Sequence, residues 1–163
     1  MDDAWQDRLV PEVRVRAATP ADAGEVGILV ELAYAPYVGR IGRRPAPMDQ
    51  DYRAVLLVGT GWVAELDGRI AGVAIAVPRP TSLLLDNLAV DPEVQGTGIG
   101  ERLLAEVERH ALALGLHRID LYTNEAMTEN LAYYERRGYR ETARAEEDGF
   151  RRVYLSRMLP AAP

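Results

Sequence analysis

A glycine-rich run at residues 95–100, Gln-Gly-Thr-Gly-Ile-Gly, constrains the fold of this chain more than any other feature. It joins an apolar, strand-like stretch at 83–90 to a helix-like stretch at 99–114. The first N–H groups of a helix have no intrahelical partners, and the helix dipole adds partial positive charge there. A strand, a glycine turn and a helix start can therefore bind phosphate oxygens without a basic side chain. Glycine also lets the backbone approach a ligand closely, so the run predicts an anion-binding turn.

The spacing of these glycines does not match two familiar phosphate-binding loops. A dinucleotide fingerprint, G-x-G-x-x-G, would require a third glycine at Glu101 or Leu103. A nucleotide P-loop requires G-K-[ST], whereas Glu101 and Arg102 follow the last glycine. A dinucleotide oxidoreductase is therefore a disfavoured alternative, and the sequence predicts a phosphate ligand of another kind.

Composition excludes several other classes of protein. The 163 residues have the length of one domain. The chain has no cysteine, which excludes disulfides and a cysteine nucleophile, and only two histidines, so we expect no metal site. A net charge of -6 disfavours a nucleic-acid-binding protein. The acidic start does not resemble a secretory leader and no apolar run is long enough for a membrane span, so we expect a cytoplasmic protein that binds no membrane.

Hydrophobic periodicity predicts alternating strands and helices after an irregular start. Residues 1–12 are interpreted as an N-terminal extension and residues 13–159 as a single domain. Thr19, followed by a proline and by Asp22, predicts a helix start, and the apolar spacing of that helix runs to Ala33. The other predicted helices are 99–114 and 128–137, and the predicted strands are 13–17, 61–66, 69–77, 83–90, 118–123, 139–145 and 150–155.

Two turn signals and one crossover define the predicted topology. The Asp-Gly pairs at 67–68 and 148–149 each predict a tight hairpin turn. The helix between strands 83–90 and 118–123 predicts a central, right-handed, parallel β-α-β crossover. The order βαβββαβαββ then predicts an α/β (α+β) fold, with a mixed, mostly antiparallel sheet of about six to seven strands and helices on both faces. Prolines and glycines predict a loop over 35–52 with at most a short helix near its end.

The glycine run is part of a longer pattern. Gln95, Gly98 and Gly100 match [RQ]-x-x-G-x-[GA], the segment Leu-Ala-Val-Asp-Pro precedes them at 88–92, and a tyrosine-containing segment follows at 130–139. In these features the chain resembles the GNAT superfamily of acetyl-CoA-dependent N-acetyltransferases, over about residues 14–158. The family shows the same order of strands and helices, so the resemblance implies a GNAT-like sheet.

The resemblance also implies an activity and a cosubstrate. It implies that the chain transfers an acetyl group from acetyl-CoA to an amine by direct attack within a ternary complex, without a metal. The lack of cysteine agrees with direct attack, because no thiol is present to carry the acyl group. A small-molecule amine and a peptide N-terminus both stay open as acceptors, and so does a homodimer. The alternative function is a non-catalytic acyl-CoA-binding sensor or partner module.

The resemblance assigns the cofactor-binding residues to the strand and the turn. In the family the strand carries a bulge and splays from its parallel neighbour, which frees backbone groups to pair with pantetheine amides. A freed N–H near Leu88 would polarise the acetyl carbonyl. The alternative reading of this strand as a buried core strand is compatible, since side chains can pack while the backbone binds. The predicted cofactor-binding residues are Leu88, Ala89, Val90, Gln95, Gly96, Thr97, Gly98, Ile99, Gly100 and Asn130.

Two residues are predicted to act in the chemistry. Tyr134 stands four residues before Gly138, as the catalytic tyrosine of the family stands before its glycine, and its phenol can donate a proton to the departing sulfur. Asp86 lies just before the expected bulge and is the predicted proton acceptor. The alternatives are that Tyr134 is an ordinary half-buried aromatic residue, and that Asp86 pairs with a neighbouring arginine or faces solvent. Helical rotation predicts that Tyr133 points away from Tyr134.

The loop after the first helix is the predicted acceptor pocket, because the family often builds its acceptor pocket there. Tyr34, Tyr37 and Arg40 are the predicted substrate-binding residues, with Arg43 and Arg44 nearby. Arginines can bind a carboxylate or a phosphate through paired hydrogen bonds. The alternative is a solvated basic loop or part of a dimer contact.

Overall fold

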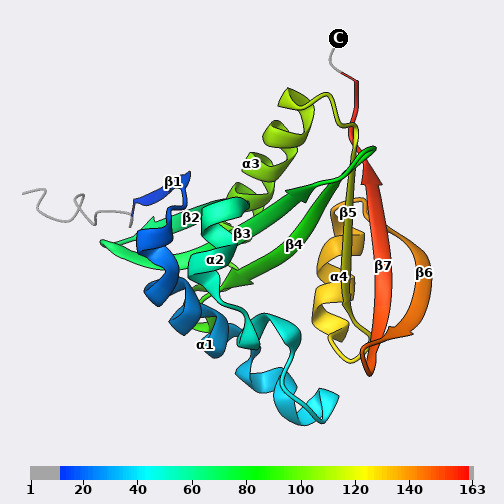
Figure 1. Ribbon diagram of the computed structural model, residues 1–163, viewed down its shortest axis with the longest axis horizontal. Helices are drawn as coiled ribbons and strands as arrows, with labels where there is room; N and C mark the ends of the chain where they lie inside the picture. The colour runs from blue at the N-terminus through cyan, green and yellow to red at the C-terminus, as the bar shows by residue number, and fades with distance from the viewer. Residues whose placement is uncertain (1–11, 162–163) are drawn as a thin grey trace, which may run out of the picture.

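The computed structural model describes residues 12–161, so the predicted N-terminal extension lies outside the described residues except for Glu12. The described chain forms one seven-stranded sheet in the order β1-β2-β3-β4-β5-β7-β6 (Figure 1). Neighbouring strands are antiparallel except for β4 and β5, which are parallel. The strands are β1 (Val13–Ala17), β2 (Thr60–Leu66), β3 (Arg69–Pro78), β4 (Leu83–Val90), β5 (Arg118–Asn124), β6 (Arg140–Glu147) and β7 (Phe150–Met158).

Four helices cover the two faces of this sheet, which confirms the predicted fold class and the parallel crossover. One buried cluster joins α1 and α2 to one face, and a second joins α3 and α4 to the other. The helices are α1 (Ala23–Ile41), α2 (Tyr52–Val58), α3 (Ile99–Ala113) and α4 (Thr128–Arg136), with short 3-10 turns η1 (Pro20–Asp22), η2 (Ala46–Asp49) and η3 (Pro92–Val94).

The two predicted hairpin turns are present. Asp67 and Gly68 have φ angles of 51° and 76°, and Asp148 and Gly149 have φ angles of 52° and 78°. Two successive residues with positive φ are the requirement of the type I′ turn, which matches the twist of the flanking strands. Asp-Gly pairs therefore set the register of both hairpins.

The prediction of a loop over 35–52 is wrong for residues 35–41, which continue helix α1. Near the end of this range the expected short helix is present as η2, and a further helix, α2, follows it. Helix α1 continues through Pro36 to Ile41 and ends at Gly42, whose φ is 82° and whose N–H donates to the Val38 carbonyl at 2.9 Å. Proline removes one helical hydrogen bond, to the carbonyl of Leu32, a residue that is 53% exposed. Helix α2, which the periodicity did not predict, begins after Asp51, whose carboxylate accepts hydrogen bonds from its first N–H groups.

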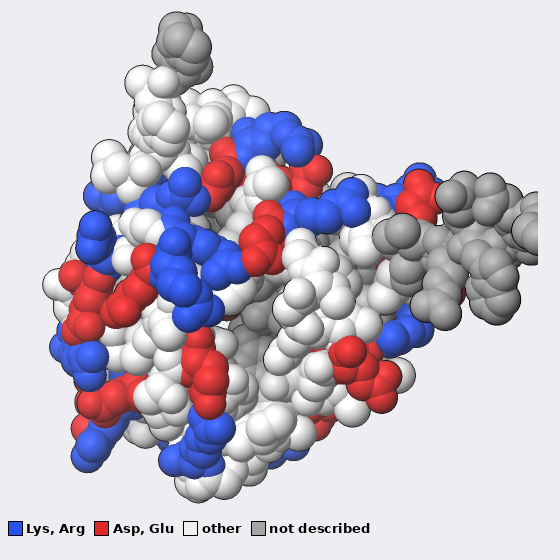
Figure 2. Space-filling view, turned by 180° about the vertical axis from the view of Figure 1, so that it is seen from behind, with Lys and Arg blue, Asp and Glu red and all other residues white. Residues whose placement is uncertain are grey.

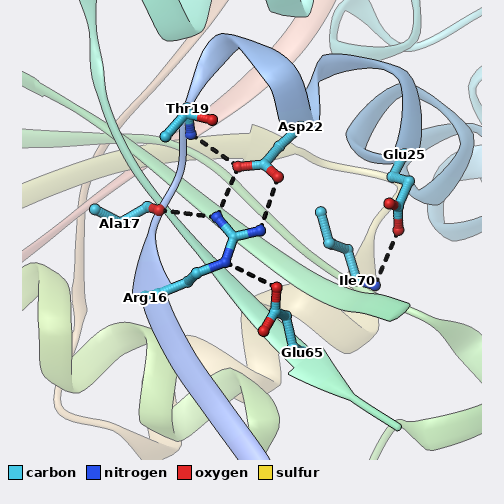
Figure 3. Close-up of polar contacts among 7 residues, drawn as sticks. All are labelled: Arg16, Ala17, Thr19, Asp22, Glu25, Glu65 and Ile70. Carbon is cyan, nitrogen blue, oxygen red and sulfur yellow. Dashed lines mark hydrogen bonds and ion pairs between the residues drawn. The ribbon is translucent and has the colours of Figure 1, made fainter. Parts of the chain in front are cut away.

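An ion-pair network fixes the entry of the chain into α1 (Figure 3). The Arg16 guanidinium donates to both Asp22 oxygens at 2.8 and 2.9 Å and to Glu65 at 2.8 Å. Asp22 also accepts the Thr19 N–H at 2.8 Å, as the predicted helix start requires. Hydrogen bonds from Arg16 lower the pKa of Asp22 below its ordinary value. The network ties β1, η1 and β2 together.

Two further properties concern residues 12–161 as a whole. None of the helices in this part of the chain is long and apolar enough to cross a membrane. The same residues bring together no group of three or more metal-binding side chains. The cytoplasmic location stays a prediction.

Candidate functional site

Strands β4 and β5 diverge and leave a gap in the sheet. Within the described chain their ladder joins residues 83–85 to residues 119–121 and goes no further, although β4 continues to Val90. Figure 1 shows the two strands meeting at one end and moving apart toward the other. The later part of β4 is therefore paired with β3 on one side and open on the other.

A bulge in β4 lies where the two strands separate. Ala76 of β3 lies opposite Leu85, and Ile75 lies opposite Asn87, so Asp86 is an extra residue in β4. A bulge bends its strand, which turns the end of β4 away from β5. The sequence placed Asp86 just before the bulge, and the structure places the bulge at Asp86 itself.

The backbone groups of Leu88 and Val90 face the gap. The Asp91 N–H donates to the Ala71 carbonyl of β3 at 2.8 Å. Bonded and non-bonded pairs alternate along an antiparallel ladder, so Leu88 and Val90 direct their N–H and C=O groups away from β3. The Gln95 side-chain amide donates to the Val90 carbonyl from this side at 3.3 Å. An extended ligand can pair with such an edge as an added strand does.

The glycine turn between β4 and α3 leaves open space for a ligand. Gly96 and Gly98 have φ angles of 80° and 90°, and a Cβ at either position would meet no atom of residues 12–161 within 4 Å. Positive φ at these two positions favours glycine. Helix α3 begins at Ile99, so its first N–H groups lie at the turn and are available to an anion.

The gap and the turn form one groove of about 360 Å³. Figure 2 shows the face behind that of Figure 1, where a hollow opens near the middle beside a group of cationic side chains. Ala89 is buried in the core on the α1 side, and Thr97 is exposed outside the groove lining. The predicted cofactor-binding residues that line the groove are Leu88, Val90, Gln95, Gly96, Gly98, Ile99, Gly100 and Asn130.

The groove also contains cationic residues that the sequence analysis did not select. Arg136 and Arg137 follow the predicted tyrosine pair on α4 and line the groove. The Arg137 guanidinium forms an ion pair with Glu101 in the first turn of α3. The pair offsets the negative charge of Glu101 at the helix start. In the sequence, the two consecutive arginines before Gly138 were the feature that could have indicated these groove residues.

Tyr133 packs against the start of α3. A Cβ on Gly100 would lie 2.5 Å from Tyr133 Oη, so this contact requires a glycine. The Arg137 guanidinium lies 3.4 Å from the centroid of the Tyr133 ring, and burial raises the pKa of Tyr133 to about 12. Helical rotation predicted that Tyr133 points away from Tyr134, but both tyrosines line the groove.

Tyr134 is buried among other tyrosine rings at the groove. It is 7% exposed, and its ring makes edge contacts with Tyr133 and Tyr139 at centroid distances of 5.3 and 5.4 Å. Burial raises the pKa of Tyr134 well above its ordinary value. The phenol is therefore protonated at neutral pH and can donate to a charge that develops on a nearby atom.

A second cavity, which we call the Asp86 cavity, has a volume of about 80 Å³. Burial raises the pKa of Asp86, while Arg79 and Arg152 partly offset that increase. A carboxylate with a raised pKa is a better proton acceptor at neutral pH than an ordinary one. The cavity lining comprises Tyr34, Ile41, Pro45, Ala46, Pro47, Gln50, Asp86, Tyr122, Thr123, Asn124, Met127, Phe150 and Arg152.

A chain of hydrogen bonds fixes Tyr34 in this lining. The Tyr34 hydroxyl donates to Asn87 Oδ1 at 2.8 Å, and Asn87 Nδ2 donates to the Tyr52 hydroxyl at 3.0 Å. The Tyr52 hydroxyl donates to the Pro47 carbonyl at 2.6 Å. These partners satisfy buried polar groups and connect α1, β4 and the segment before α2.

The other predicted substrate-binding residues lie elsewhere. Tyr37 lines the groove and is absent from the described lining of the Asp86 cavity. Arg40 lies with its guanidinium 5.3 Å from the Tyr37 ring centroid and pairs with Glu129 of α4 at 2.7 Å. Tyr34 thus lines the Asp86 cavity and Tyr37 lines the groove, and the role of Tyr37 and Arg40 in substrate binding stays a prediction.

The remaining arginines of the predicted acceptor loop make contacts within the protein. Arg43 donates to the Asp148 carbonyl at 2.8 Å, and its guanidinium lies 3.9 Å from the Phe150 ring centroid. Arg44 pairs with Asp49 at 2.9 Å and also with Glu31. These contacts favour a structural role for the two arginines.

The profile of the Acetyltransferase (GNAT) family matches residues 29–139. This span contains the gap at β4, the glycine turn, α3 and Tyr134. The chain belongs to the GNAT acetyltransferase family. The resemblance of the glycine run to that family is thereby confirmed.

Two curated relatives match part of the chain. An amino-acid acetyltransferase of Ralstonia nicotianae is 42% identical over 79 residues, which are 47% of this chain and 17% of that protein. A mycothiol acetyltransferase of Propionibacterium freudenreichii subsp. shermanii is 36% identical over 85 residues, which are 51% of this chain and 24% of that protein. The match thus spans at most about a quarter of the length of either relative.

A solved structure shares the fold of almost the whole chain. The PaiA N-acetyltransferase of Thermoplasma acidophilum, in complex with coenzyme A, has a TM-score of 0.76 at 14% identity. The similarity covers 90% of this chain and 99% of that chain. At this identity the likeness supports the fold alone.

Proposed function

We propose that this chain transfers the acetyl group of acetyl-CoA to an amine by direct attack in a ternary complex, and that residues 13–159 act as one domain. The gap between β4 and β5, beside the glycine turn, carries the proposal. It combines helix N–H donors for a diphosphate with free strand groups for an extended arm. The names of the two relatives support acetyl transfer in general and leave the acceptor open.

The groove residues fit coenzyme A. The N–H groups of residues 96–100 would hold the pyrophosphate, with Arg136 beside them. Leu88 and Val90 would pair with the pantetheine amides, and the Leu88 N–H would polarise the acetyl carbonyl. Asn130, one helical turn before Tyr134, would contact the same arm. Bound acetyl-CoA supplies the activated acetyl group.

Asp86 and Tyr134 would share the proton transfers. The Asp86 carboxylate accepts one proton from the acceptor ammonium and frees the nitrogen lone pair. Tyr134 donates its hydroxyl proton to the sulfur that leaves as the nitrogen forms its bond to the acetyl carbon. The nitrogen then returns a proton to the Tyr134 phenolate. The products are an amide, the thiol of coenzyme A and one proton, which Asp86 passes to solvent.

Calorimetry with acetyl-CoA, combined with a thiol-release assay over a panel of amines, tests this function. We expect binding together with thiol release for at least one amine. Binding without thiol release for any amine would instead support the non-catalytic sensor. Lack of binding at millimolar concentration would contradict both functions. All 19 cationic residues are arginine, so acetylation of the chain's own lysines cannot add to the signal.

Tyr134→Phe is the matched variant for this assay. It removes the proposed proton donor but keeps the ring in its tyrosine cluster. Because general acid catalysis contributes about 10²–10⁴-fold, we expect kcat to fall by about 10²-fold or more while acetyl-CoA affinity stays within about threefold. Unchanged kcat would exclude Tyr134 as the proton donor.

A further inference from the structure

We propose, resting on the acetyltransferase function above, that the Asp86 cavity selects a compact free amino acid as the acceptor, whose amine binds Asp86 and whose carboxylate binds Arg152. The two side chains carry opposite charges and face one cavity. The proposal therefore names the class of acceptor and the residue that selects it.

The size of the cavity favours a small acceptor. Its volume is about 80 Å³, against about 360 Å³ for the groove, which suits the charged end of a small molecule. The segment at residues 41–50, which contributes to the cavity lining, is fixed at two points. Arg43 holds it to the β6–β7 turn at Asp148, and the Tyr52 hydroxyl holds the Pro47 carbonyl. A folded protein surface would have to displace these contacts.

Asp86 is suited to bind the ammonium of the acceptor. It faces the cavity and forms no ion pair with another residue of the range 12–161. A carboxylate removed from water needs a cation or hydrogen-bond donors. Asp86 also stands two residues before Leu88, whose N–H faces the gap. The proposal therefore places a nitrogen held by Asp86 near the acetyl carbonyl at Leu88, two residues further along β4.

Arg152 is suited to bind the carboxylate. Its guanidinium lies 4.4 Å from the centroid of Tyr122 and 5.9 Å from that of Phe150, and its side chain is 14% exposed. One N–H group donates to Glu147 at 2.9 Å. A guanidinium has five N–H donors in a planar fork, so donors remain for a carboxylate. Among the described lining residues, Arg152 is the one with a permanent positive charge.

The rest of the lining favours an aliphatic body. Ile41, Met127 and Phe150 contribute apolar surface to the same lining. Asp86 and Arg152 form no ion pair with each other within the described chain, so an acceptor that bears both charges can lie between them. A simple amine would leave the Arg152 donors without an acceptor, and sites built to bind a polar group discriminate against ligands that lack it.

Acceptors matched in pairs test the proposal, with kcat/KM measured at saturating acetyl-CoA by thiol release. Alanine is compared with ethylamine, and valine with isobutylamine, because each amine is the amino acid without its carboxylate. Alaninamide represents a peptide N-terminus. We expect each amino acid to exceed its amine, and alanine to exceed alaninamide, by about tenfold or more.

Arg152→Gln tests the residue, and Arg144→Gln is its matched control. Arg144 is exposed on β6 and pairs with Glu141 outside the cavity. We expect Arg152→Gln to raise KM for alanine about tenfold or more with a smaller change in kcat, and to lower kcat/KM for ethylamine by much less than for alanine. Arg144→Gln should change neither acceptor. Arg152→Lys keeps the charge and should retain part of the preference, which provides a second variant if the glutamine variant does not fold.

Three results would overturn the proposal. Equal kcat/KM for the amino acids and their amines would show that the carboxylate is not recognised. Equal kcat/KM for alanine and alaninamide would favour a peptide N-terminus as the acceptor. An equal loss for alanine and ethylamine in Arg152→Gln would show a structural role for Arg152. If acetyl-CoA binds but no thiol is released with any acceptor, the proposed acetyltransferase function fails as well. This outcome differs from the three above, in which thiol is released and only the proposed acceptor class fails.

Discussion

Asp86 and Tyr134 illustrate how burial suits two residues to the opposite roles proposed for them. Burial raises the pKa of both groups, because it disfavours the charged form of an acid. For Tyr134 the increase keeps the proton that a leaving thiolate needs. For Asp86 it makes the carboxylate more basic, which suits acceptance of a proton. One physical cause therefore favours both proposed roles, that of the proton donor at the groove and that of the proton acceptor at the Asp86 cavity.

The pH profile of kcat tests the role of Asp86. Its carboxylate must be ionised to accept a proton, so activity should rise with pH through a pKa above the ordinary value of about 3.9. Asp86→Asn should lower kcat by about 10²-fold or more and remove this acidic limb. The pH profiles of kcat for the wild-type chain and for Asp86→Asn, recorded with the same acceptor, provide the measurement. An asparagine variant that keeps both the rate and the limb would exclude Asp86 as the base.

At the scale of elements, the start of α3 depends on a contact with α4. Tyr133 Oη lies where a Cβ of residue 100 would stand, and within residues 12–161 this buried hydroxyl has no hydrogen-bond partner. From the sequence, a glycine at position 100 is expected to let the backbone approach a ligand closely. The structure adds a packing reason, since Gly100 makes room for a tyrosine from another helix.

A double-mutant cycle tests this contact. Gly100→Ala should lower the free energy of unfolding by about 1–3 kcal/mol, the usual cost of overpacking. Tyr133→Phe should be neutral or stabilising, because it removes a buried hydroxyl without a partner, and it should restore most of the loss in the double variant. Denaturant unfolding of the four proteins measures the coupling.

Gly24→Ala is the control for a glycine without such a contact. A Cβ on Gly24 in α1 would meet no described atom within 4 Å, so alanine should be neutral or stabilising by up to about 1 kcal/mol. Additive effects of Gly100→Ala and Tyr133→Phe would contradict the proposed packing.

Local signals predicted most elements, and tertiary contacts decided the rest. Alternating apolar residues and Asp-Gly turns predicted the strands, and the glycine run predicted the start of α3. Pro36 was interpreted as part of a loop, but α1 continues through it, at the loss of the one hydrogen bond that a proline cannot donate. A seven-residue helix such as α2 is too short for a clear periodic signal, and its Asp51 cap was the remaining clue.

The sequence predicted the parts of the candidate site that are formed by the backbone. It did not predict the parts that depend on the contacts of long side chains. The turn at 95–100 and the open edge of β4 follow from local sequence and family resemblance. The partners of Arg40, Arg43 and Arg137 lie far away in the chain. Spacing along a sequence does not show which distant acid or carbonyl an arginine reaches.

At the scale of the whole molecule, the gap divides the sheet into β1–β4 and β5–β7, and arginine contacts connect the two parts. They join α1 to α4, the segment after α1 to the β6–β7 turn, and α3 to both α4 and β7. Each exposed ion pair contributes little alone, but together they bridge a sheet whose central ladder is short. The contacts are Arg40 with Glu129, Arg43 with Asp148, Arg137 with Glu101, and Arg157 with Glu108.

Amide hydrogen exchange of the wild-type chain, with and without saturating coenzyme A, tests most directly whether the gap and the turn hold the coenzyme. Bound coenzyme should slow exchange at Leu88, at Val90 and across residues 96–101, because their N–H groups gain acceptors. Strand β6 lies outside the groove lining and should exchange at an unchanged rate. Saturation that leaves residues 88, 90 and 96–101 unprotected would contradict the account.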